Sequence, residues 1–513
     1  MDGDALKEKE PSLSTVLSRA PAGLAAPQVR VEVHLGPGLP AFIIVGLPET
    51  VVRESKERVR SAILNSRFKF PDGRITVNLA PADLPKEGGR FDLPIALGIL
   101  AAGAQIPARV LERREFYGEL SLTGELRETP RLLPSLIVGA QQCGELIIPT
   151  ANAAEGSLIG STRIRLADSL SQVCRALCED EPLPCASRAQ AVTMESAGPD
   201  LAEVRGQFAA KRALEIAACG AHGMLLIGPP GAGKTLLAQR LPGLLPPLDA
   251  DQALQVAAIA SVAGNRPSTG VTPPFRRPQH TASAASLIGG GMHLRPGELA
   301  MAHHGVLFLD ELPEFSRDAL ESLREPLESG VVVLSRAKRV TEYPAQFQLI
   351  AAMNPCPCGY QGDSRRRCHC TGEQVRRYRG KLSGPLIDRI DIHLEIQALP
   401  PEHLLQTAGA SGESSAEVAR RVSAARNLQI KRQGKLNSRL TGSDVARHCA
   451  LDRATRALLA QAIARLGMSA RGYDRVLKLA RSCADLIATD CLGIAQVSEA
   501  IALRALDRAA PSE

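Results

Sequence analysis

The chain has 513 residues, of which 44% are hydrophobic and 22% charged, and its formal net charge is +7. This length predicts two to four domains with a hydrophobic core in each. The small positive excess is compatible with a polyanionic partner without requiring one. Trp is absent and aromatic residues make up only 3%. A base-stacking surface for single strands is therefore poorly supplied, and any DNA contact should run through phosphates.

The N-terminus and the cysteines narrow the class of protein further. Residues 1–10 are largely charged and lack the apolar core of a secretory signal. The sequence contains no run of about 18 apolar residues, so no transmembrane helix is predicted. Most of the twelve cysteines are scattered, which does not fit a disulfide framework. We therefore expect a soluble cytoplasmic protein with no membrane partner.

A tail over residues 1–12 precedes a first domain over residues 13–180, which has mixed α/β character. The helical spacing of Val52, Val59 and Ile63 predicts an amphipathic helix over 51–66. Alternating or continuous apolar runs predict strands. Strands are predicted over 29–34, 41–45, 75–79, 118–124 and 146–148. A second, apolar helix is predicted over 93–102.

This first domain resembles the Lon-protease-like, ribosomal-S5-like fold in three phrases, at residues 79–83, 86–94 and 118–125. Lon proteases carry a nucleophilic Ser where this chain reads Arg90-Phe-Asp, and a Lys in the segment after the third phrase. No Lys occurs between residues 114 and 150. Because a Ser–Lys mechanism needs both groups, we expect a structural or DNA-facing domain without peptidase activity.

Composition divides the rest of the chain. A linker rich in Pro, Ser and Ala is predicted over residues 181–203, and a second linker over residues 398–415. Between them, residues 204–397 are predicted to form a nucleotide-binding core. Beyond them, apolar residues at helical spacing predict a small helical lid over residues 416–510.

A glycine-rich segment lies between an apolar strand and a helix and matches the P-loop pattern G-x-x-x-x-G-K-[ST]. In such a loop, backbone N–H groups and the helix N-terminus bind phosphate oxygens. Lys234 would contact the β- and γ-phosphates of ATP, and Thr235 would bind Mg²⁺. The predicted phosphate-binding residues are Gly228, Pro229, Pro230, Gly231, Ala232, Gly233, Lys234 and Thr235.

Two later apolar strands end in polar residues. Asp310 ends one of them and would hold Mg²⁺ as part of the nucleotide site, while Glu311 would polarise the attacking water. Asn354 ends the other strand and would emerge beside Asp310, near the γ-phosphate, if the sheet is parallel. Its position before Pro355 also suits simple turn chemistry.

These motifs, together with residues 352–359 and 383–393, resemble the magnesium-chelatase-like AAA+ ATPases. With the Lon-like domain in front, nearly the whole chain resembles the ComM/YifB family. The resemblance implies an α/β protein with an N-terminal S5/Lon-like α+β domain, a central AAA+ core with a parallel sheet, and a C-terminal helical lid. It also implies a homo-hexameric ATPase that drives DNA branch migration, a helicase-like activity, when incoming DNA recombines during natural transformation.

The resemblance assigns two arginines to the catalytic set that also contains Glu311 and Asn354. Arg389 matches the arginine finger that acts on the nucleotide of a neighbouring subunit. Arg471 matches the sensor-2 arginine acting within its own subunit, and Arg475, one helical turn later, is the competing choice. The alternative for each is a surface or helix-pairing arginine.

Basic segments offer candidates for DNA contact. A predicted hairpin has a tip that would touch phosphates or be simply solvated, formed by Arg336, Lys338 and Arg339. Residues 420–439 carry seven basic residues and no acidic one, which fits a DNA-backbone stripe or a solvated helix face. The insert over residues 266–298 resembles the helix-2 insert that points to a ring pore, although the usual His pair reads Gln279-His280 here.

Four cysteines in the loop 356–370 form a C-x-C…C-x-C pattern, namely Cys356, Cys358, Cys368 and Cys370. Four thiolates can close a tetrahedral Zn²⁺ site, and His369 offers another donor. Free buried thiols or a redox role are the alternatives. The expected cofactors are thus ATP and Mg²⁺, with structural Zn²⁺ as a further candidate.

Two other functions remain open from the sequence. The chain could be the ATPase subunit of a metal-inserting chelatase, or an AAA+ module that remodels protein.

Overall fold

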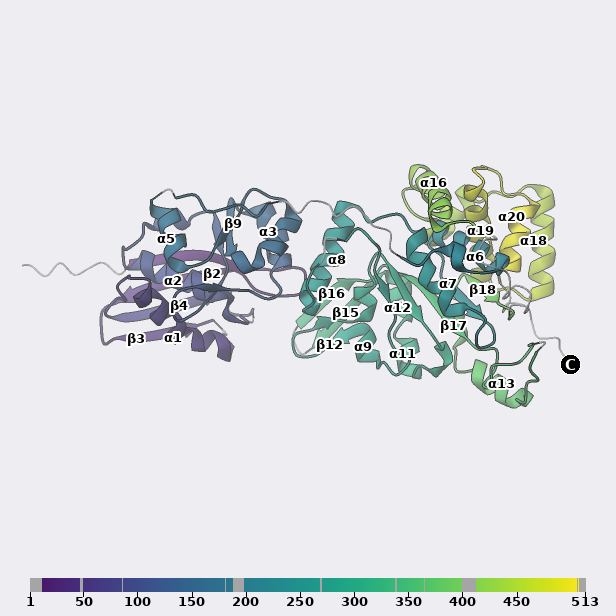
Figure 1. Cartoon of the computed structure of the whole chain (residues 1–513), viewed down its shortest axis with the longest axis horizontal. Helices are drawn as coiled ribbons and strands as arrows, with labels where there is room; N and C mark the ends of the chain where they lie inside the picture. Colours follow the sequence, from purple (N-terminus) through teal and green to yellow (C-terminus); the bar gives the residue numbers. More distant parts are fainter. Residues whose placement is uncertain are drawn as a thin grey trace, which may run out of the picture. The chain divides into compact units, whose positions relative to one another are not determined.

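The computed structural model describes residues 12–46, 49–84, 86–179, 181–187, 198–267, 270–336, 339–363, 365–398, 412–504 and 506. They form two compact units (Figure 1). Unit 1 comprises Met1–Thr193 and Ala253–Gly270, and unit 2 comprises Met194–Gln252 and Val271–Glu513. The predicted fold class is confirmed, since the chain is mixed α/β with a parallel-sheet core and a helical C-terminal region. None of the described helices is long and apolar enough to cross a membrane.

Unit 1 is built on a seven-stranded mixed sheet with the order β3-β4-β2-β1-β5-β8-β9. The strands bury alternate side chains, as the period of two along a strand requires. Five helices accompany the sheet, and α2 is buried along its whole length beside β1 and β2. The strands are β1 (Ser12–Arg19), β2 (Gln28–Gly36), β3 (Ala41–Val45), β4 (Arg74–Ala80), β5 (Arg114–Phe116), β8 (Glu145–Pro149) and β9 (Ile164–Ala167). The helices are α1 (Thr50–Asn65), α2 (Asp92–Ala102), α3 (Leu133–Gln142), α4 (Ala153–Ile159) and α5 (Leu170–Cys178).

Two predictions for unit 1 need correction. The predicted strand over 118–124 is only β6 (Glu119–Leu120), which forms a two-residue ladder with β7 (Leu126–Arg127). A turn interrupts it because Gly124 has φ +90° and the N–H groups of Gly124 and Glu125 bond back to Ser121. Strand β1, which begins inside the predicted tail, was not anticipated. Residues 1–11 of that tail lie outside the described residues.

A buried arginine of unit 1 stands where the resemblance to Lon proteases predicted the nucleophile position. Arg90 is 3% exposed, and its guanidinium donates to the carbonyl of Pro130 at 2.7 Å and to Ser135 at 3.3 Å. Burial lowers the pKa of Arg90 to about 10. Two residues later, Asp92 accepts hydrogen bonds from Arg58 at 2.7 and 3.2 Å, while burial raises the pKa of Asp92 to about 7. These bonds anchor the start of α2.

The second half of helix α8 (Ala250–Ala263) belongs to unit 1, whereas the predicted nucleotide-binding core ran without a break over 204–397. Ala257 and Ala258 pack against Leu133 of α3. The Ser261 hydroxyl donates to Glu155 at 2.8 Å. The sequence shows only that α8 has an apolar face, and the packing partner of that face is a tertiary property.

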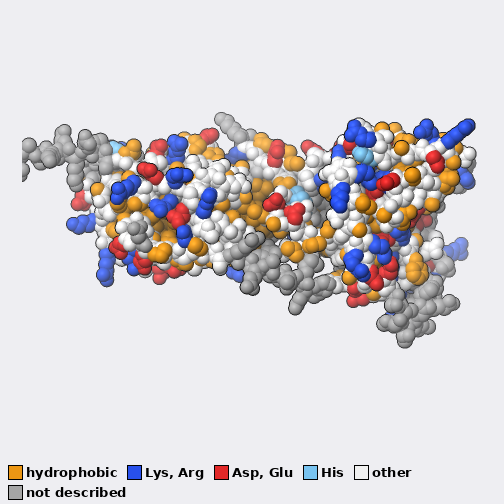
Figure 2. Space-filling model, turned by 90° about the horizontal axis from the view of Figure 1, so that it is seen from above, with side chains coloured by type: hydrophobic (Ala, Val, Ile, Leu, Met, Phe, Trp, Pro, Cys, Tyr) orange, Lys and Arg blue, Asp and Glu red, His pale blue; other side chains and the backbone are white. Residues whose placement is uncertain are grey.

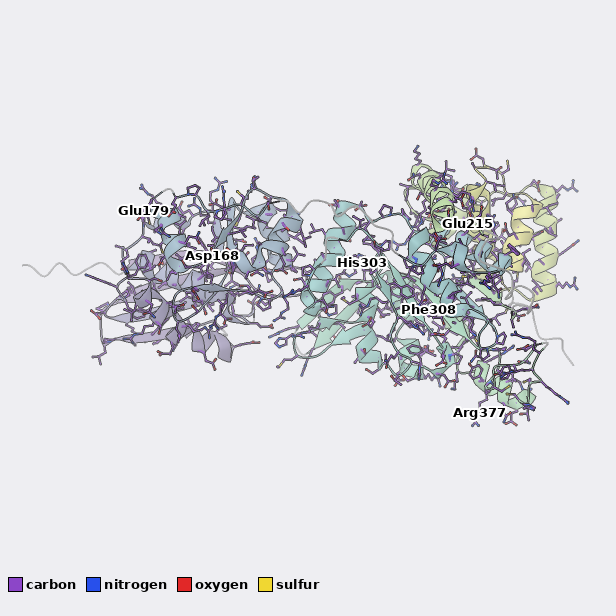
Figure 3. The ribbon with its side chains drawn as sticks, viewed as in Figure 1. Asp168, Glu179, Glu215, His303, Phe308 and Arg377 are labelled. Atoms are coloured by element: carbon purple, nitrogen blue, oxygen red, sulfur yellow. The ribbon has the colours of Figure 1, made fainter. Side chains whose placement is uncertain are left out.

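Unit 2 contains a five-stranded parallel sheet with the order β11-β14-β17-β10-β18. Strands β10, β14 and β17 are buried at every residue, and Figure 3 marks Phe308 on β14. Burial on both faces explains why their sequences are continuous apolar runs. The strands are β10 (Met224–Ile227), β11 (Phe275–Arg276), β14 (Val306–Leu309), β17 (Gln348–Met353) and β18 (Ile392–Glu395).

The C-terminal helices pack into the same core as this sheet. Helix α19 lies against α6, α16 and α20, and a continuous apolar cluster joins Leu214 of α6 to Val476 of α19. The long helices are α6 (Phe208–Gly220), α16 (Ser415–Gln433), α17 (Gly442–His448), α18 (Arg453–Leu466), α19 (Ala470–Leu486) and α20 (Ile494–Ala502). Shorter elements are α7 (Lys234–Arg240), α9 (Ala284–Ile288), β12 (Gly289–Gly290), β13 (Arg295–Pro296), α10 (Glu298–Met301), α11 (Arg317–Glu321), α12 (Arg324–Ser329), β15 (Val331–Arg336), β16 (Arg339–Pro344), α13 (Gly372–Arg379) and α14 (Gly384–Ile387).

Candidate nucleotide site

The P-loop connects the carboxyl end of β10 to the start of α7. Gly231 and Gly233 have φ angles of +79° and +89°, a region that side chains other than glycine enter at a cost. A Cβ at either position would meet no atom within 4 Å. The two glycines are therefore required by backbone conformation and not by crowding. The curled backbone that results is suited to presenting N–H groups to phosphate oxygens.

Lys234 and Thr235 reach the residues predicted to join them. The Lys234 ammonium donates to the carbonyl oxygens of Gly228 at 2.6 Å and Pro229 at 3.0 Å, and to Asn354 Oδ1 at 3.0 Å. Burial lowers the pKa of Lys234. The Thr235 hydroxyl donates to Asp310 Oδ2 at 2.9 Å. The sheet order explains these contacts, since β17 lies between β14 and β10 and all three end at the same edge.

Glu311 stands apart from these hydrogen-bonded groups. Its side chain is 55% exposed, and its backbone has φ +53°, which is unusual for a non-glycine residue. Strained backbone of this kind often marks a functional position. The conformation leaves the Glu311 carboxylate accessible next to Asp310, whose side chain is 24% exposed.

Two residues near these carboxylates were missed by the sequence analysis as members of the site. Arg277 donates to Asp310 Oδ2 at 2.8 Å, and His280 Nδ1 lies 3.4 Å from Glu311 Oε2. Both follow β11, which pairs in parallel with β14, so their side chains emerge beside the end of β14. The sequence does show basic residues after Phe275 that could have indicated this site. A strand of two residues, however, is too short to recognise from sequence.

The oxygen donors at this edge fit Mg²⁺. The Thr235 hydroxyl and the Asp310 carboxylate are adjacent, and hydroxyl and carboxylate oxygens are ligands that this ion prefers. Arg277 shares Oδ2 of Asp310 with Thr235, so its guanidinium balances the carboxylate charge at the same position that an ion would use.

The opposite, amino edge of the sheet borders a cavity of about 650 Å³. It is lined by Gly223, Gly305, Gln348 and Asp391, which precede or begin strands β10, β14, β17 and β18. Its lining is strongly basic, with two carboxylates, Glu328 and Asp391, against six cations, Arg389, Arg426, Lys435, Arg439, Arg475 and Lys478.

Arg389 is the predicted arginine finger, and it lies in this cavity and not beside the P-loop. Its Nη2 atom pairs with Glu328 at 2.5 Å and its Nη1 atom donates to the carbonyl of Pro385 at 2.7 Å. Its buried Nε donor meets no acceptor within the described part of the chain. Arg475 lines the same cavity and forms an ion pair with Asp391, which also accepts from His222 at 3.0 Å. The buried position of Asp391 opposes its ionisation, but Arg475 and His222 together hold its pKa well below the ordinary value.

Arg471 lies elsewhere. It is exposed at the start of α19 and does not line the cavity that contains Arg475. The P-loop side chains bond to other residues: Lys234 to Asn354, and Thr235 to Asp310. Of the two candidate arginines of α19, only Arg475 lines the cavity that also contains Arg389.

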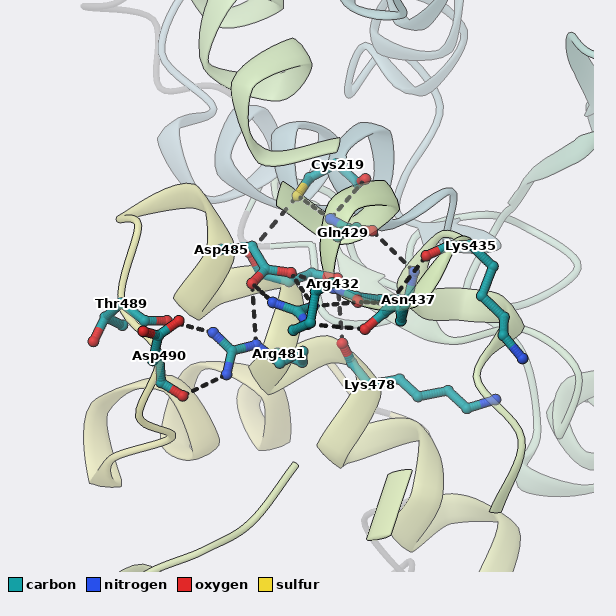
Figure 4. Close-up of polar contacts among 12 residues, drawn as sticks. Cys219, Gln429, Arg432, Lys435, Asn437, Lys478, Arg481, Asp485, Thr489 and Asp490 are labelled. Atoms are coloured by element: carbon teal, nitrogen blue, oxygen red, sulfur yellow. Dashed lines mark hydrogen bonds and ion pairs between the residues drawn. The ribbon is translucent and has the colours of Figure 1, made fainter. Parts of the chain in front are cut away.

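A buried polar network positions further cations of the cavity (Figure 4). Arg432 of α16 makes two bonds to Asp485 of α19, at 2.6 and 2.9 Å, and Asn437 donates to the same carboxylate at 2.8 Å. Lys435 and Lys478 leave this network on the same side. Burial lowers the pKa of Lys478, and the neighbouring charge of Arg475 lowers it further. The network thus concentrates positive charge before any anion is present.

Three family descriptions match most of the chain. "Magnesium chelatase, subunit ChlI" matches residues 200–404, "Subunit ChlI of Mg-chelatase" matches 31–152, and "Magnesium chelatase, subunit ChlI C-terminal" matches 412–504. The YifB protein of Salmonella typhimurium is 48% identical over 97% of this chain and 98% of its own length. The competence protein ComM of Haemophilus influenzae is 46% identical over 97% of this chain and 98% of its own length.

This chain belongs to the ComM/YifB family of magnesium-chelatase-like AAA+ proteins. Similarity to the chelatases themselves is narrower. The magnesium-chelatase 67 kDa subunit of Heliobacterium mobile is 30% identical over 32% of this chain and 29% of its own length. Membership in the family indicates an ATPase that uses ATP and Mg²⁺, and the arrangement of Lys234, Thr235 and Asp310 fits that use.

The predicted DNA-contacting tip of this ComM/YifB protein is a hairpin of β15 and β16. Arg336 and Arg339 are exposed and lie directly opposite each other in the ladder. Lys338 lies outside the described residues. Two like charges at facing positions repel each other.

The basic stretch over 420–439 forms neither a row of unpaired cations for the DNA backbone nor a simply solvated helix face. Five of its seven cations bond within unit 2 to carboxylates, carbonyls or an amide. For example, Arg421 donates to Glu215 at 2.7 Å, and Arg426 to the carbonyl of Ala218 at 2.6 Å. Figure 3 marks Glu215 on α6. Other Lys and Arg side chains remain on the helical surface at the right of Figure 2. The five are Arg421, Arg426, Arg432, Lys435 and Arg439.

Proposed function

We propose that the chain is a ring-forming ATPase that moves DNA, acting as a branch-migration helicase when incoming DNA is recombined. The proposal of ATPase activity rests on how the functional side chains are divided between the two edges of the unit 2 sheet. The carboxyl edge holds the phosphate-binding lysine and the carboxylates, and the amino edge holds Arg389 and Arg475. Within the described residues, Arg389, the predicted finger, thus lies at the edge opposite its own P-loop.

At its own site, Lys234 binds the β- and γ-phosphates and backbone N–H groups of the loop surround the remaining oxygens. Thr235 and Asp310 would hold Mg²⁺, which when bound neutralises charge on the phosphate oxygens. Glu311 accepts a hydrogen bond from the attacking water and draws off its proton. Asn354, already bonded to Lys234, orients the γ-phosphate or the water. Arg277, which donates to the same Oδ2 of Asp310, would compete with Mg²⁺ for that oxygen.

A neighbouring subunit completes the site. We assign Arg389 and Arg475 to the nucleotide of the adjacent subunit, since both line the amino edge. A head-to-tail interface that brings an amino edge onto a carboxyl edge repeats around a ring. A planar guanidinium stabilises charge that develops on transferred phosphoryl oxygens. Arg389 would exchange its pairing with Glu328 for the incoming phosphate. We take the ring to be a hexamer, as the family resemblance implies.

DNA is the proposed substrate on two grounds. A relative that covers nearly the whole chain is named a competence protein, and the β15–β16 hairpin presents facing exposed arginines. The proposed contacts are to phosphates and independent of sequence, in agreement with the shortage of aromatic residues. Such a protein would act in the cytoplasm, where both ATP and DNA are available.

The test is the ATPase rate with and without a four-way DNA junction, in 50 and 200 mM salt conditions (roughly the range over which phosphate contacts weaken strongly). We expect stimulation by the junction that exceeds stimulation by duplex of equal length and that declines with salt. A plot of log DNA affinity against log salt concentration has a negative slope. In the double variant Arg336→Ala, Arg339→Ala this slope should become less steep by about two. Lack of stimulation by any DNA would reject the motor.

The chelatase-type function is the second candidate, because the family descriptions name that enzyme's subunit. An ATPase that ignores DNA but responds to a tetrapyrrole-binding partner would support it. A response to protein substrates alone would support the remodelling alternative.

A further inference from the structure

An irregular segment between β17 and α13 carries four cysteines that the nucleotide site does not use. Apart from its first residues, this segment of unit 2 is mostly exposed, and its described residues form neither helix nor strand. Cys356 is fully buried, and Cys358, Cys368 and Cys370 are half-buried. A loop with so little apolar burial needs another source of order.

The four sulfur atoms lie close together. The Sγ–Sγ distances are 3.4 Å for Cys356–Cys358, 3.6 Å for Cys356–Cys368 and 3.5 Å for Cys358–Cys368. With Cys370 included, all four lie within 4.8 Å of one another. A disulfide would need about 2.05 Å. Four sulfurs at about 2.3 Å from a zinc ion are separated by about 3.8 Å, the edge of that tetrahedron.

Backbone amides orient these sulfurs. The N–H of Cys358 donates to Cys370 Sγ, that of Cys370 to Cys368 Sγ, and that of Gln361 to Cys356 Sγ, each at 3.4 Å. Hydrogen bonds to a thiolate stabilise its negative charge and fix its direction, which is the role of the outer shell at metal sites. His369, the other donor in the sequence, is exposed and is not part of the group of four.

We propose that a structural Zn²⁺ binds four thiolates, those of Cys356, Cys358, Cys368 and Cys370. Binding converts four thiols to four zinc-bound thiolates and releases four protons, with no change of oxidation state. Four protein ligands complete the tetrahedron, so the ion has no open position for catalysis. The ion replaces the hydrophobic core that this loop does not have.

The loop adjoins the nucleotide residues, which gives the ion a second consequence. Pro355 joins Asn354 to Cys356, and its carbonyl accepts from Arg379 of α13 at 3.1 Å. Gly359 has φ +87°, and a Cβ there would lie 2.8 Å from Cδ of Pro230 in the P-loop. Figure 1 shows α13 at the periphery of the sheet. The zinc site therefore braces both Asn354 and the P-loop from outside, an inference that rests on the proposed nucleotide site.

Zinc content tests the metal site independently of nucleotide binding. The full-length protein, purified from zinc-replete medium without chelator, should contain about one zinc per chain by elemental analysis. The double variant Cys356→Ser, Cys368→Ser should contain almost none. The control variant Cys178→Ser, Cys491→Ser, which changes two exposed cysteines outside the loop, should keep its zinc. Wild-type protein without zinc, or a loop variant that retains it, would overturn the proposal.

Two further measurements distinguish loss of the metal site from misfolding of the loop variant. Cobalt added in place of zinc should give the intense visible absorption of a tetrahedral thiolate site, whereas a weak octahedral spectrum would contradict four sulfur ligands. The variant Cys370→His should retain zinc, since three Cys and one His also form a structural site.

The bracing is tested by the affinity of a fluorescent ATP analogue. The zinc-free loop variant should bind it about tenfold or more weakly, and Cys370→His should bind it with nearly the wild-type affinity. Unchanged affinity after zinc loss would reject the bracing while leaving the metal site. Failure of zinc-loaded wild-type protein to bind the analogue would instead reject the proposed nucleotide site.

Discussion

The two edges of the unit 2 sheet differ in how they are built. At the carboxyl edge, the functional residues directly follow strands: the P-loop follows β10, Asp310 follows β14 and Asn354 follows β17. At the amino edge, the cations come mainly from helices and turns more than 150 residues after the P-loop, as with Arg389 and Arg475. The first edge is encoded by short motifs, and the second by long-range packing.

This difference has an energetic counterpart. The carboxyl edge uses backbone conformation, with positive φ at Gly231, Gly233 and Glu311, to expose its groups. The amino edge uses a buried acid, Asp391, to hold Arg475. Removing Asp391 would leave a half-buried cation without its partner, a destabilising change. Substitutions at the first edge should therefore alter chemistry, and many at the second edge should alter stability as well.

The largest expected effect separates binding from turnover at the carboxyl edge. Glu311→Gln should reduce the ATPase kcat by about 10²–10⁴-fold and leave ATP affinity nearly unchanged, because the amide cannot take a proton from water. Phosphate release and equilibrium ATP binding measure the two quantities. Glu314→Gln, which changes an exposed residue of the adjacent short turn, is the matched control and should keep normal turnover. Normal kcat in Glu311→Gln would refute the assignment.

The next effect tests whether the amino edge acts on a neighbour. Arg389→Ala should lower kcat by about 10³-fold, the scale of an arginine finger. Mixing it in equal amounts with Glu311→Gln should restore activity at about a quarter of the interfaces, where an intact edge meets an intact edge. Arg456→Ala, on the exposed face of α18, is the control. A mixture as inactive as its parts would show that both groups serve one subunit.

A smaller effect concerns the arginine at the carboxyl edge. Arg277→Gln removes a cation 2.8 Å from Asp310 Oδ2, so Mg²⁺ should bind more tightly, by about fivefold for a partly exposed pair. The concentration of Mg²⁺ that gives half-maximal ATPase activity measures this change. An increased requirement for Mg²⁺ would mean that Arg277 holds Asp310 in position instead of competing with the ion.

The smallest effect is a pH dependence at the amino edge. Burial, reinforced by His304 and Arg439, lowers the pKa of His303 to about 3, and its Nδ1 accepts from the N–H of Gln346. Between pH 6.5 and 3 the unfolded chain gains a proton that the folded chain does not. Stability should thus fall as the pH decreases, by about 1 kcal/mol between pH 7 and 5.5. Urea unfolding measures it, and His303→Asn should flatten the dependence.

The sequence predicted the fold class, and it located the motifs that the structure brings together at the carboxyl edge, because the information there is local. A glycine loop, an apolar strand with terminal carboxylates and a third strand ending in Asn354 each lie within a few residues. Parallel pairing then brings them to one place. Parallel pairing of β11 with β14 would also have indicated Arg277 and His280. Strand β11 has only two residues, however, which is too short for an apolar pattern to be detected in the sequence.

The sequence could not choose between Arg471 and Arg475, because both lie on one helix, one turn apart, with the same chemistry. Their surroundings differ only in the folded chain, where Asp391, just before β18, pairs with Arg475. Likewise, the basic stretch over 420–439 gave no sign that most of its cations have partners in α6, α17, α19 and the segment before β17. Charge content is local, but pairing of charges separated by many residues is not.

By itself, the sequence determined the P-loop motif and the polar residues that end two later strands, because a phosphate-binding motif depends on residue types at fixed short spacing. It also determined the presence of four thiols in one loop. Only the tertiary structure decided that Ala253–Gly270 belongs to unit 1. It also decided that Arg389 and Arg475 share a cavity, and that the four sulfurs converge in a loop whose Gly359 lies against Pro230 of the P-loop. These are contacts between segments far apart in the chain, and burial of apolar faces and pairing of buried charges select them only once the whole core is assembled.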